Sequence, residues 1–180
     1  MNQKLIELYK SKFPALKEHI DGYNATSNDQ AVNPYLLKVD NKWEMAKRRI
    51  MVFGQETNIW AAECGNNGKF SGKVEEVIDV YDKWYLKDTM DNTRFWKAFR
   101  LIRDSFSNNS VAFAANNIVK IGRIGTGCIP RIHELTVKHF DVIPQEIEIL
   151  KTDTLIFLTG PNYDSKIKDI LGNFTTFRIS

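Results

Sequence analysis

The fold of this chain is decided by the stretch Arg49-Ile50-Met51-Val52-Phe53-Gly54-Gln55-Glu56-Thr57-Asn58. Its apolar run, Ile50 to Phe53, predicts a short buried strand. The strand stops at Gly54, and polar side chains follow at once. In open α/β folds, ligands bind at the carboxyl edge of the sheet. We therefore expect residues 54–58 to lie at such an edge, the alternative being an ordinary polar turn after a strand.

The composition is that of one globular domain. The chain has 180 residues, of which 43% are hydrophobic and 26% charged, and its net charge of +3 tolerates a polyanionic partner without requiring one. Cys64 and Cys128 form no disulfide framework and have no metal-ligand spacing, which favours reduced thiols in an intracellular protein. No apolar run approaches the roughly 20 residues that span a bilayer. We expect a soluble, cytoplasmic monomer with no membrane partner.

Two further apolar runs predict strands at 111–115 and 154–158, and residues 174–179 are a candidate fourth, edge strand. Between the strands, helical spacing predicts helices at 74–81 with Ser71 as N-cap, from about Asp91, at 132–140, from Pro144 and at 167–171. Residues 2–20 have a helical pattern interrupted at Pro14, which predicts two short helices or one with a kink, and 21–33 form a loop. This alternation predicts a three-layer α/β/α domain with a four-stranded, mainly parallel sheet. The single domain, 1–180, would comprise a helical extension at 1–45 and an α/β core at 46–180.

The predicted strand ends bring three polar groups of residues to one edge. Asn116-Asn117 and Thr159-Gly160-Pro161-Asn162 would join residues 55–58 there. Glu56 is the only carboxylate among them, so it is the candidate general base, with turn capping as its alternative role. Asn117 offers a paired donor and acceptor that suit a base edge or an amide, although it could equally stabilise a turn. The three histidines lack ligand spacing, and no cofactor motif is present, so we expect neither metal nor cofactor.

These residues resemble the uracil-DNA glycosylase superfamily. The segment 52–58 is similar to that family's first motif, a strand running into Gly-Gln-Asp-Pro-Tyr, and Phe70-Ser71 matches a Phe-Ser pair downstream. Asn117-Ile118-Val119-Lys120, the glycines up to Pro130 and then Glu134 resemble an Asn-x-Val-Lys segment of another branch. The residues from Glu146 to Gly160 resemble the family's helix and strand ending in Gly. The similarity covers roughly residues 45 to 172.

The resemblance implies a uracil-DNA glycosylase-like fold and a hydrolase that flips a damaged, deaminated base out of single- or double-stranded DNA and cleaves its N-glycosidic bond. By position, Glu56 would activate water and Gln55 would line the pocket as the second catalytic residue. Phe70 would stack on the base, and Asn117 would read its edge. The implied substrate-binding residues are Gly54, Thr57, Asn58, Phe70, Asn117, Lys120, Thr159 and Gly160. No metal or cofactor is implied.

The chain also departs from the family pattern. Glu56 stands where the family has Asp or Asn, Thr57-Asn58 replace Pro-Tyr, and no His-Pro-Ser motif follows. Two alternatives therefore stay open. One is a member of the same fold that binds nucleic acid or nucleotide and has lost the chemistry, and the other is an unrelated α/β enzyme acting on a small amide-bearing ligand. The sequence also leaves open which base is recognised and whether the nucleic acid is DNA or RNA.

Overall fold

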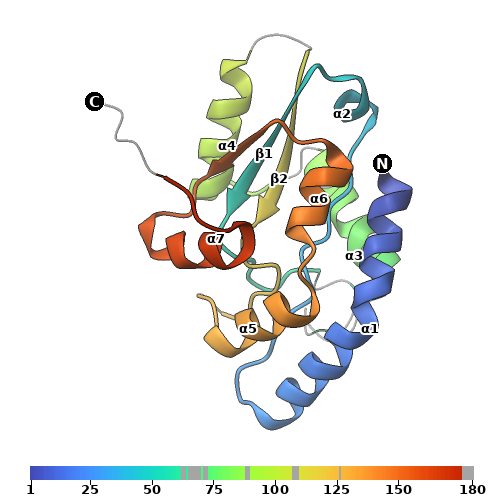
Figure 1. The fold of residues 1–180 in the computed structure, drawn as a ribbon, viewed down its shortest axis with the longest axis vertical. Coiled ribbons are helices and arrows are strands. Elements are labelled where there is room, and N and C mark those ends of the chain that lie inside the picture. Colours follow the sequence, from blue (N-terminus) through green and yellow to red (C-terminus); the bar gives the residue numbers. More distant parts are fainter. Residues whose placement is uncertain are drawn as a thin grey trace.

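Three parallel strands form the centre of the molecule in the order β2-β1-β3 (Figure 1). The computed structural model describes residues 1–61, 64, 70, 73–87, 90–106, 110–125 and 127–175. The strands are β1 (Arg48–Gly54), β2 (Val111–Asn117) and β3 (Thr154–Phe157). All three predicted apolar runs are thus strands. In the register, Gly54 of the central strand lies opposite Asn117, and Phe53 lies opposite Phe157.

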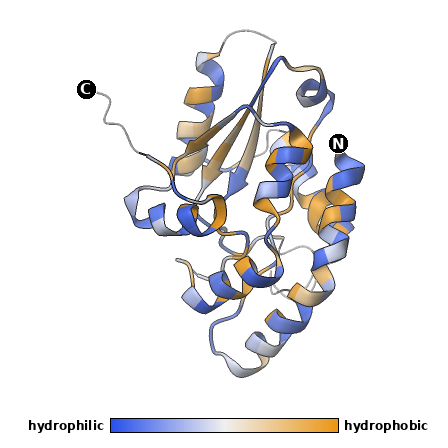
Figure 2. Ribbon diagram, in the orientation of Figure 1, coloured by the Kyte–Doolittle hydropathy of each residue, from blue (hydrophilic) through white to orange (hydrophobic). Residues whose placement is uncertain are grey.

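Helices pack on both faces of this sheet. Because side chains alternate along a strand, Ile50 and Val52 face α4 (Arg94–Ser105), where they pack with Trp96 and Phe99. Met51 and Phe53 face the opposite way, into the larger core. That core is built with α1 (Asn2–Thr26), α2 (Asn41–Met45), α3 (Val74–Tyr81), α5 (Pro130–His139), α6 (Ile143–Leu150) and α7 (Asp164–Leu171). A π-helical turn, η3 (Asp82–Leu86), continues α3. Figure 2 shows the hydrophobic strands between helices that have a hydrophobic and a hydrophilic side.

The N-terminal segment differs from the prediction. Helix α1 runs through Pro14 as a single helix, which excludes the alternative of two short helices, and it continues to Thr26, so the loop predicted to begin at Asp21 was wrong there. An internal proline removes one backbone hydrogen bond and costs about 3 kcal/mol. The helix nevertheless continues because five side chains on one face are buried in the core: Leu5, Tyr9, Phe13, Leu16 and Ile20. Residues 1–26 are therefore part of the larger core, packed beside α3 and α5 (Figure 1).

Most of the other predicted helices are confirmed with shifted ends. Helix α4 begins at Arg94, because the Thr93 hydroxyl accepts a hydrogen bond from the Trp96 N–H at 3.5 Å. The predicted cap Ser71 and most of the predicted fourth strand, residues 176–179, lie outside the described residues. Phe174 and Thr175 are not in a strand, so the sheet has three strands in the part of the chain that the structure describes. No described helix is both long enough and apolar enough to cross a membrane.

Candidate functional site

The carboxyl ends of the three strands meet at one edge of the sheet. Backbone N–H groups of Ile118 and Val119 donate to the carbonyls of Gly54 and Gln55, each at 3.0 Å, and Leu158 donates to Phe53 at 2.8 Å. The Gln55 side chain adds a cross-link, because its Nε2 donates to the Thr159 carbonyl at 2.7 Å. The structure therefore brings together the strand ends that contain Gln55, Asn117 and Thr159.

Glu56 is held at this edge by a tyrosine. Its Oε2 accepts a hydrogen bond from the Tyr163 hydroxyl, and its side chain is half-buried. Tyr163 ends the 3₁₀ turn η4 (Pro161–Tyr163), which connects β3 to α7, and Gly160 before it has a φ of 74° that favours glycine. Burial raises the pKa of Tyr163, and the hydrogen bond to Glu56 raises it further. The phenol therefore stays protonated and donates a hydrogen bond to the Glu56 carboxylate.

A lysine and a cysteine complete the charge environment of Glu56. Lys166 Nζ lies 4.8 Å from the centre of the Tyr163 ring, a cation–π distance. Burial raises the pKa of the half-buried Cys128 thiol to about 11, with Lys166 opposing the shift and Glu56 adding to it. Cys128 is therefore a neutral thiol at neutral pH and a poor nucleophile.

Asn117 lies against the glycine of the first motif. A Cβ on Gly54 would come within 2.8 Å of Asn117 Oδ1 and 3.1 Å of the Phe95 ring. Gly54 is thus required for the amide of Asn117 and an aromatic ring from α4 to approach the strand end closely. Asn117 is 8% exposed, and its backbone N–H donates to Asn116 Oδ1 at 2.8 Å.

The loop that contains Gly122 and Gly125 packs against Thr57 and Asn58. A Cβ on Gly122 would lie 1.8 Å from the Thr57 carbonyl oxygen, so only glycine permits this backbone approach. Asn58 Oδ1 accepts a hydrogen bond from the Gly125 N–H at 3.0 Å, and Asn58 forms a β-bridge with Arg123. The Thr57 hydroxyl is buried and has no hydrogen-bond partner among the described residues. Gly122 therefore allows one part of the chain to approach another closely.

Two of the predicted site residues lie in the core instead. The Phe70 ring stacks on Phe13 of α1, with 5.3 Å between ring centroids. Lys120 is 1% exposed, and its Nζ donates to Glu146 Oε1 at 2.7 Å, to Asn116 Oδ1 at 2.7 Å and to the Tyr35 carbonyl at 2.9 Å. The donors of Lys120 and the ring face of Phe70 are used within the fold, and neither residue joins the sheet edge.

Sequence reasoning missed four residues at or near this edge, namely Phe95, Cys128, Tyr163 and Asp164. Tyr163 and Asp164 directly follow the recognised strand end at Thr159–Asn162, so continuing that segment by two positions would have found them. Nothing in the sequence distinguished Phe95 from its aromatic neighbours on α4, Trp96 and Phe99. Among the described residues, no three His, Cys, Asp or Glu side chains are grouped so that they could hold a metal ion.

No protein-family model matches the chain, and comparison with curated proteins finds no match.

Proposed function

We propose that this protein is a DNA base glycosylase-like hydrolase, which flips a deaminated base out of DNA and cleaves its N-glycosidic bond. The observation that carries the proposal is the half-buried Glu56 carboxylate, held by the Tyr163 hydroxyl where the three strands end. A base must leave the stack before its glycosidic bond can be reached. A carboxylate beside the sugar of a flipped-out nucleotide can both accept a proton from water and stabilise positive charge on that sugar.

Each residue would have a distinct role in the reaction. Glu56 would take a proton from water as the water oxygen bonds to the sugar C1′, while the base leaves with the electrons of the C–N bond. Tyr163 would fix the carboxylate and leave its second oxygen for the water. Asn117 would read the base edge, and Gln55 would be held in place by Thr159. Cys128 is not the nucleophile in this scheme, because the pKa of its thiol is about 11.

The proposal also covers the fold, the DNA partner, the oligomeric state and the cellular location. A uracil-DNA glycosylase-like sheet has four strands, and the fourth would pair with β3, which is an edge strand among the described strands. The proposed DNA partner is compatible with the net charge of +3, which tolerates a polyanion without requiring one. We further propose a monomer that takes part in base-excision DNA repair in the cytoplasm, consistent with two cysteines that are free.

The test is base release from defined DNA. Duplexes and single strands carrying uracil, hypoxanthine or xanthine are incubated with the protein, and alkali-labile abasic sites are measured. We expect cleavage that falls at least about a hundredfold in Glu56→Gln, which keeps the side-chain shape and removes the base. Glu148→Gln, an exposed position on α6, is the matched control and should keep full activity. Activity that persists in Glu56→Gln would refute the assigned role.

The second candidate is a nucleic-acid or nucleotide binder of the same fold without chemistry. It is favoured by the contact of Tyr163 with Glu56, because the hydroxyl occupies one oxygen of the only carboxylate in the first motif. Salt-dependent retention of DNA without abasic sites would support this candidate. If no DNA binding is found even at low salt, both proposals fail.

A further inference from the structure

Helix α4 contains the excess positive charge of the chain. Its 12 residues include four basic side chains and one acidic side chain: Arg94, Lys97, Arg100, Arg103 and Asp104. The net charge of +3 on this helix equals the formal net charge of the whole chain. Helix α7, which follows β3, has two basic and two acidic side chains and so no net charge. Basic residues clustered along one helix are the electrostatic footprint of nucleic-acid-binding domains.

Two of these cations have no partner within the described chain. Arg94 and Lys97 are exposed, and in that part of the chain their side chains form neither an ion pair nor a hydrogen bond. Arg100 and Arg103, by contrast, are half-buried and hydrogen-bonded to neighbouring groups of the helix and of the turn before it. Residues three positions apart lie on one side of a helix, so Arg94 and Lys97 form a pair, about 4.5 Å apart along the axis.

This pair of cations lies beside the candidate site. Phe95, the residue after Arg94, packs at the carboxyl edge of the sheet, where its ring would be 3.1 Å from a Cβ on Gly54. The Asn117 amide meets the same point of the strand, at 2.8 Å from that Cβ. From this edge α4 runs back along the sheet with its apolar side on the strands (Figure 1). A strand of phosphates along the basic side would therefore pass next to the candidate site.

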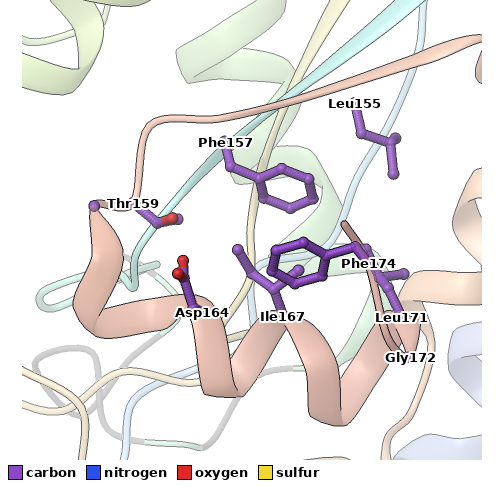
Figure 3. Close-up of a pocket in the computed structure, with 9 residues that line it drawn as sticks. Leu155, Phe157, Thr159, Asp164, Ile167, Leu171, Gly172 and Phe174 are labelled. Atoms are coloured by element: carbon purple, nitrogen blue, oxygen red, sulfur yellow. The ribbon is translucent and has the colours of Figure 1, made fainter. Parts of the chain in front are cut away.

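The opposite face of the sheet differs in charge at this edge. An apolar pocket of about 480 Å³ lies there between β3 and α7 (Figure 3). Among the residues that line this pocket, the one charged side chain is Asp164, a carboxylate. A carboxylate repels phosphate groups, so this face disfavours a phosphate backbone. Charge complementarity therefore favours the α4 side of the sheet for a polyanion.

We infer that the outward side of α4, with Arg94 and Lys97 at its site end, binds the sugar–phosphate backbone of the nucleic acid that flanks the bound base. The inference rests on the proposed function, which takes nucleic acid as the partner, and deepens it by naming the surface that binds the strand. Phosphate contacts fix the register and orientation of a protein on nucleic acid and do not read its sequence. This surface thus positions the strand, and the strand ends of the sheet are left to recognise the base.

The test is the salt dependence of DNA binding in the α4 double variant, Arg94→Gln with Lys97→Gln. Affinity for labelled duplexes and single strands is measured by fluorescence anisotropy between about 50 and 200 mM salt. Each phosphate contact contributes about 0.9 to the slope of log affinity against log salt on duplex DNA and about 0.7 on single strands. The slope should therefore fall by roughly 1.8 and 1.4, and the affinity near 0.1 M salt by roughly tenfold or more. Each single variant should give about half of the change in slope.

Lys4→Gln with Lys42→Gln is the matched control, because it removes the same charge from two exposed lysines on α1 and α2. These two helices pack in the core on the other face of the sheet from α4. The control should keep the slope and the affinity of the wild type. In the abasic-site assay, the α4 double variant should raise KM and leave kcat unchanged, since it removes binding that the ground state and the transition state share.

The outcomes for the surface and for the enzyme are separable. An unchanged slope in the α4 double variant, or an equal fall in the control, would overturn the inference, and base release in the same samples would leave the proposed function standing. A reduced slope without base release from any strand would support the surface and refute the glycosylase in favour of the binder. A wild type that binds no DNA even at low salt would overturn both.

Discussion

Replacing Lys120 by methionine tests the buried charge network at the centre of the molecule. Methionine keeps much of the length of the side chain and removes its charge. In the wild type, the Lys120 ammonium donates to Glu146, Asn116 and the Tyr35 carbonyl at 2.7–2.9 Å. Without it, Glu146, which is 0% exposed, keeps two side-chain donors among the described residues, the Tyr9 hydroxyl at 2.6 Å and the Asn116 amide at 3.0 Å.

The expected loss of stability is large because a buried carboxylate loses its counter-ion. Burial lowers the pKa of Lys120 and the facing Glu146 carboxylate raises it again in part, but three acceptors within hydrogen-bond distance hold the side chain as an ammonium. Removing one partner of a buried ion pair costs about 3–5 kcal/mol. In a domain of this length, each kcal/mol lowers Tm by about 2–4 °C, so the variant should melt roughly 6–20 °C lower.

Urea unfolding followed by tryptophan fluorescence measures the change directly, since Trp43, Trp60 and Trp96 are buried. Lys97→Met, on the exposed side of α4, is the matched control and should lie within about 0.5 kcal/mol of the wild type. Adding Glu146→Gln to Lys120→Met removes the unpaired charge and should restore part of the loss. A loss below about 1 kcal/mol in Lys120→Met, or no recovery in the double variant, would refute the assigned energetics.

Three other predictions address the surroundings of the site. Burial and then Lys166 lower the pKa of His133 below its usual 6.5, while Asp169 and Glu134 oppose this. The unfolded chain therefore binds the proton more readily, so the free energy of unfolding should fall as pH drops below about 6.5, and less so in His133→Gln. Gly122→Ala would place a methyl group 1.8 Å from the Thr57 carbonyl, and we expect a loss of at least about 1–3 kcal/mol in urea unfolding. Gly22→Ala, where nothing lies within 4 Å, is its control. Alkylation of Cys128 by iodoacetamide should be slow at neutral pH and should rise toward pH 11, and fast labelling at pH 7 would contradict the raised pKa.

The strands could be predicted from the sequence because each buried strand is a short run of consecutive apolar residues. Four or five consecutive apolar residues can be buried only in the middle of a sheet or helix, and the length of each run distinguishes the two. The edge position of Gln55, Asn117 and Thr159 followed from the parallel order of those strands, since parallel strands end at the same edge. The local pattern left two forms open at Pro14, and packing of one helix face, which outweighs the lost hydrogen bond, decides for a single helix. The polar composition from Asp21 was misleading, since the helix continues to Thr26.

The placement of Lys120 and Phe70 could not be predicted, because distant partners determine it. A role of Lys120 at the edge was implied only by the resemblance of the segment Asn117-Ile118-Val119-Lys120 to a family motif. Its side chain turns inward because Glu146 is buried beside it, and Glu146 also accepts a hydrogen bond from Tyr9, 137 positions away in the chain. Phe70 likewise stacks on Phe13 of a helix whose full length the sequence did not predict. Motif spacing specifies which residues are neighbours along the chain and leaves their side-chain directions open.

The hydrogen bonds around Lys120 extend to the candidate site, although the charged groups of Lys120 and Glu146 are in the core. Asn116 Oδ1 accepts hydrogen bonds from both the Lys120 ammonium, at 2.7 Å, and the Asn117 N–H, at 2.8 Å. Lys120 therefore fixes the Asn116 side chain, and Asn116 fixes the backbone at Asn117, whose amide lies against Gly54. On this geometry Lys120 is a positioning residue for the Asn117 amide, which we propose reads the base. Lys120→Met should then weaken substrate binding even at temperatures where the variant is fully folded, whereas a variant that is destabilised equally elsewhere should bind normally.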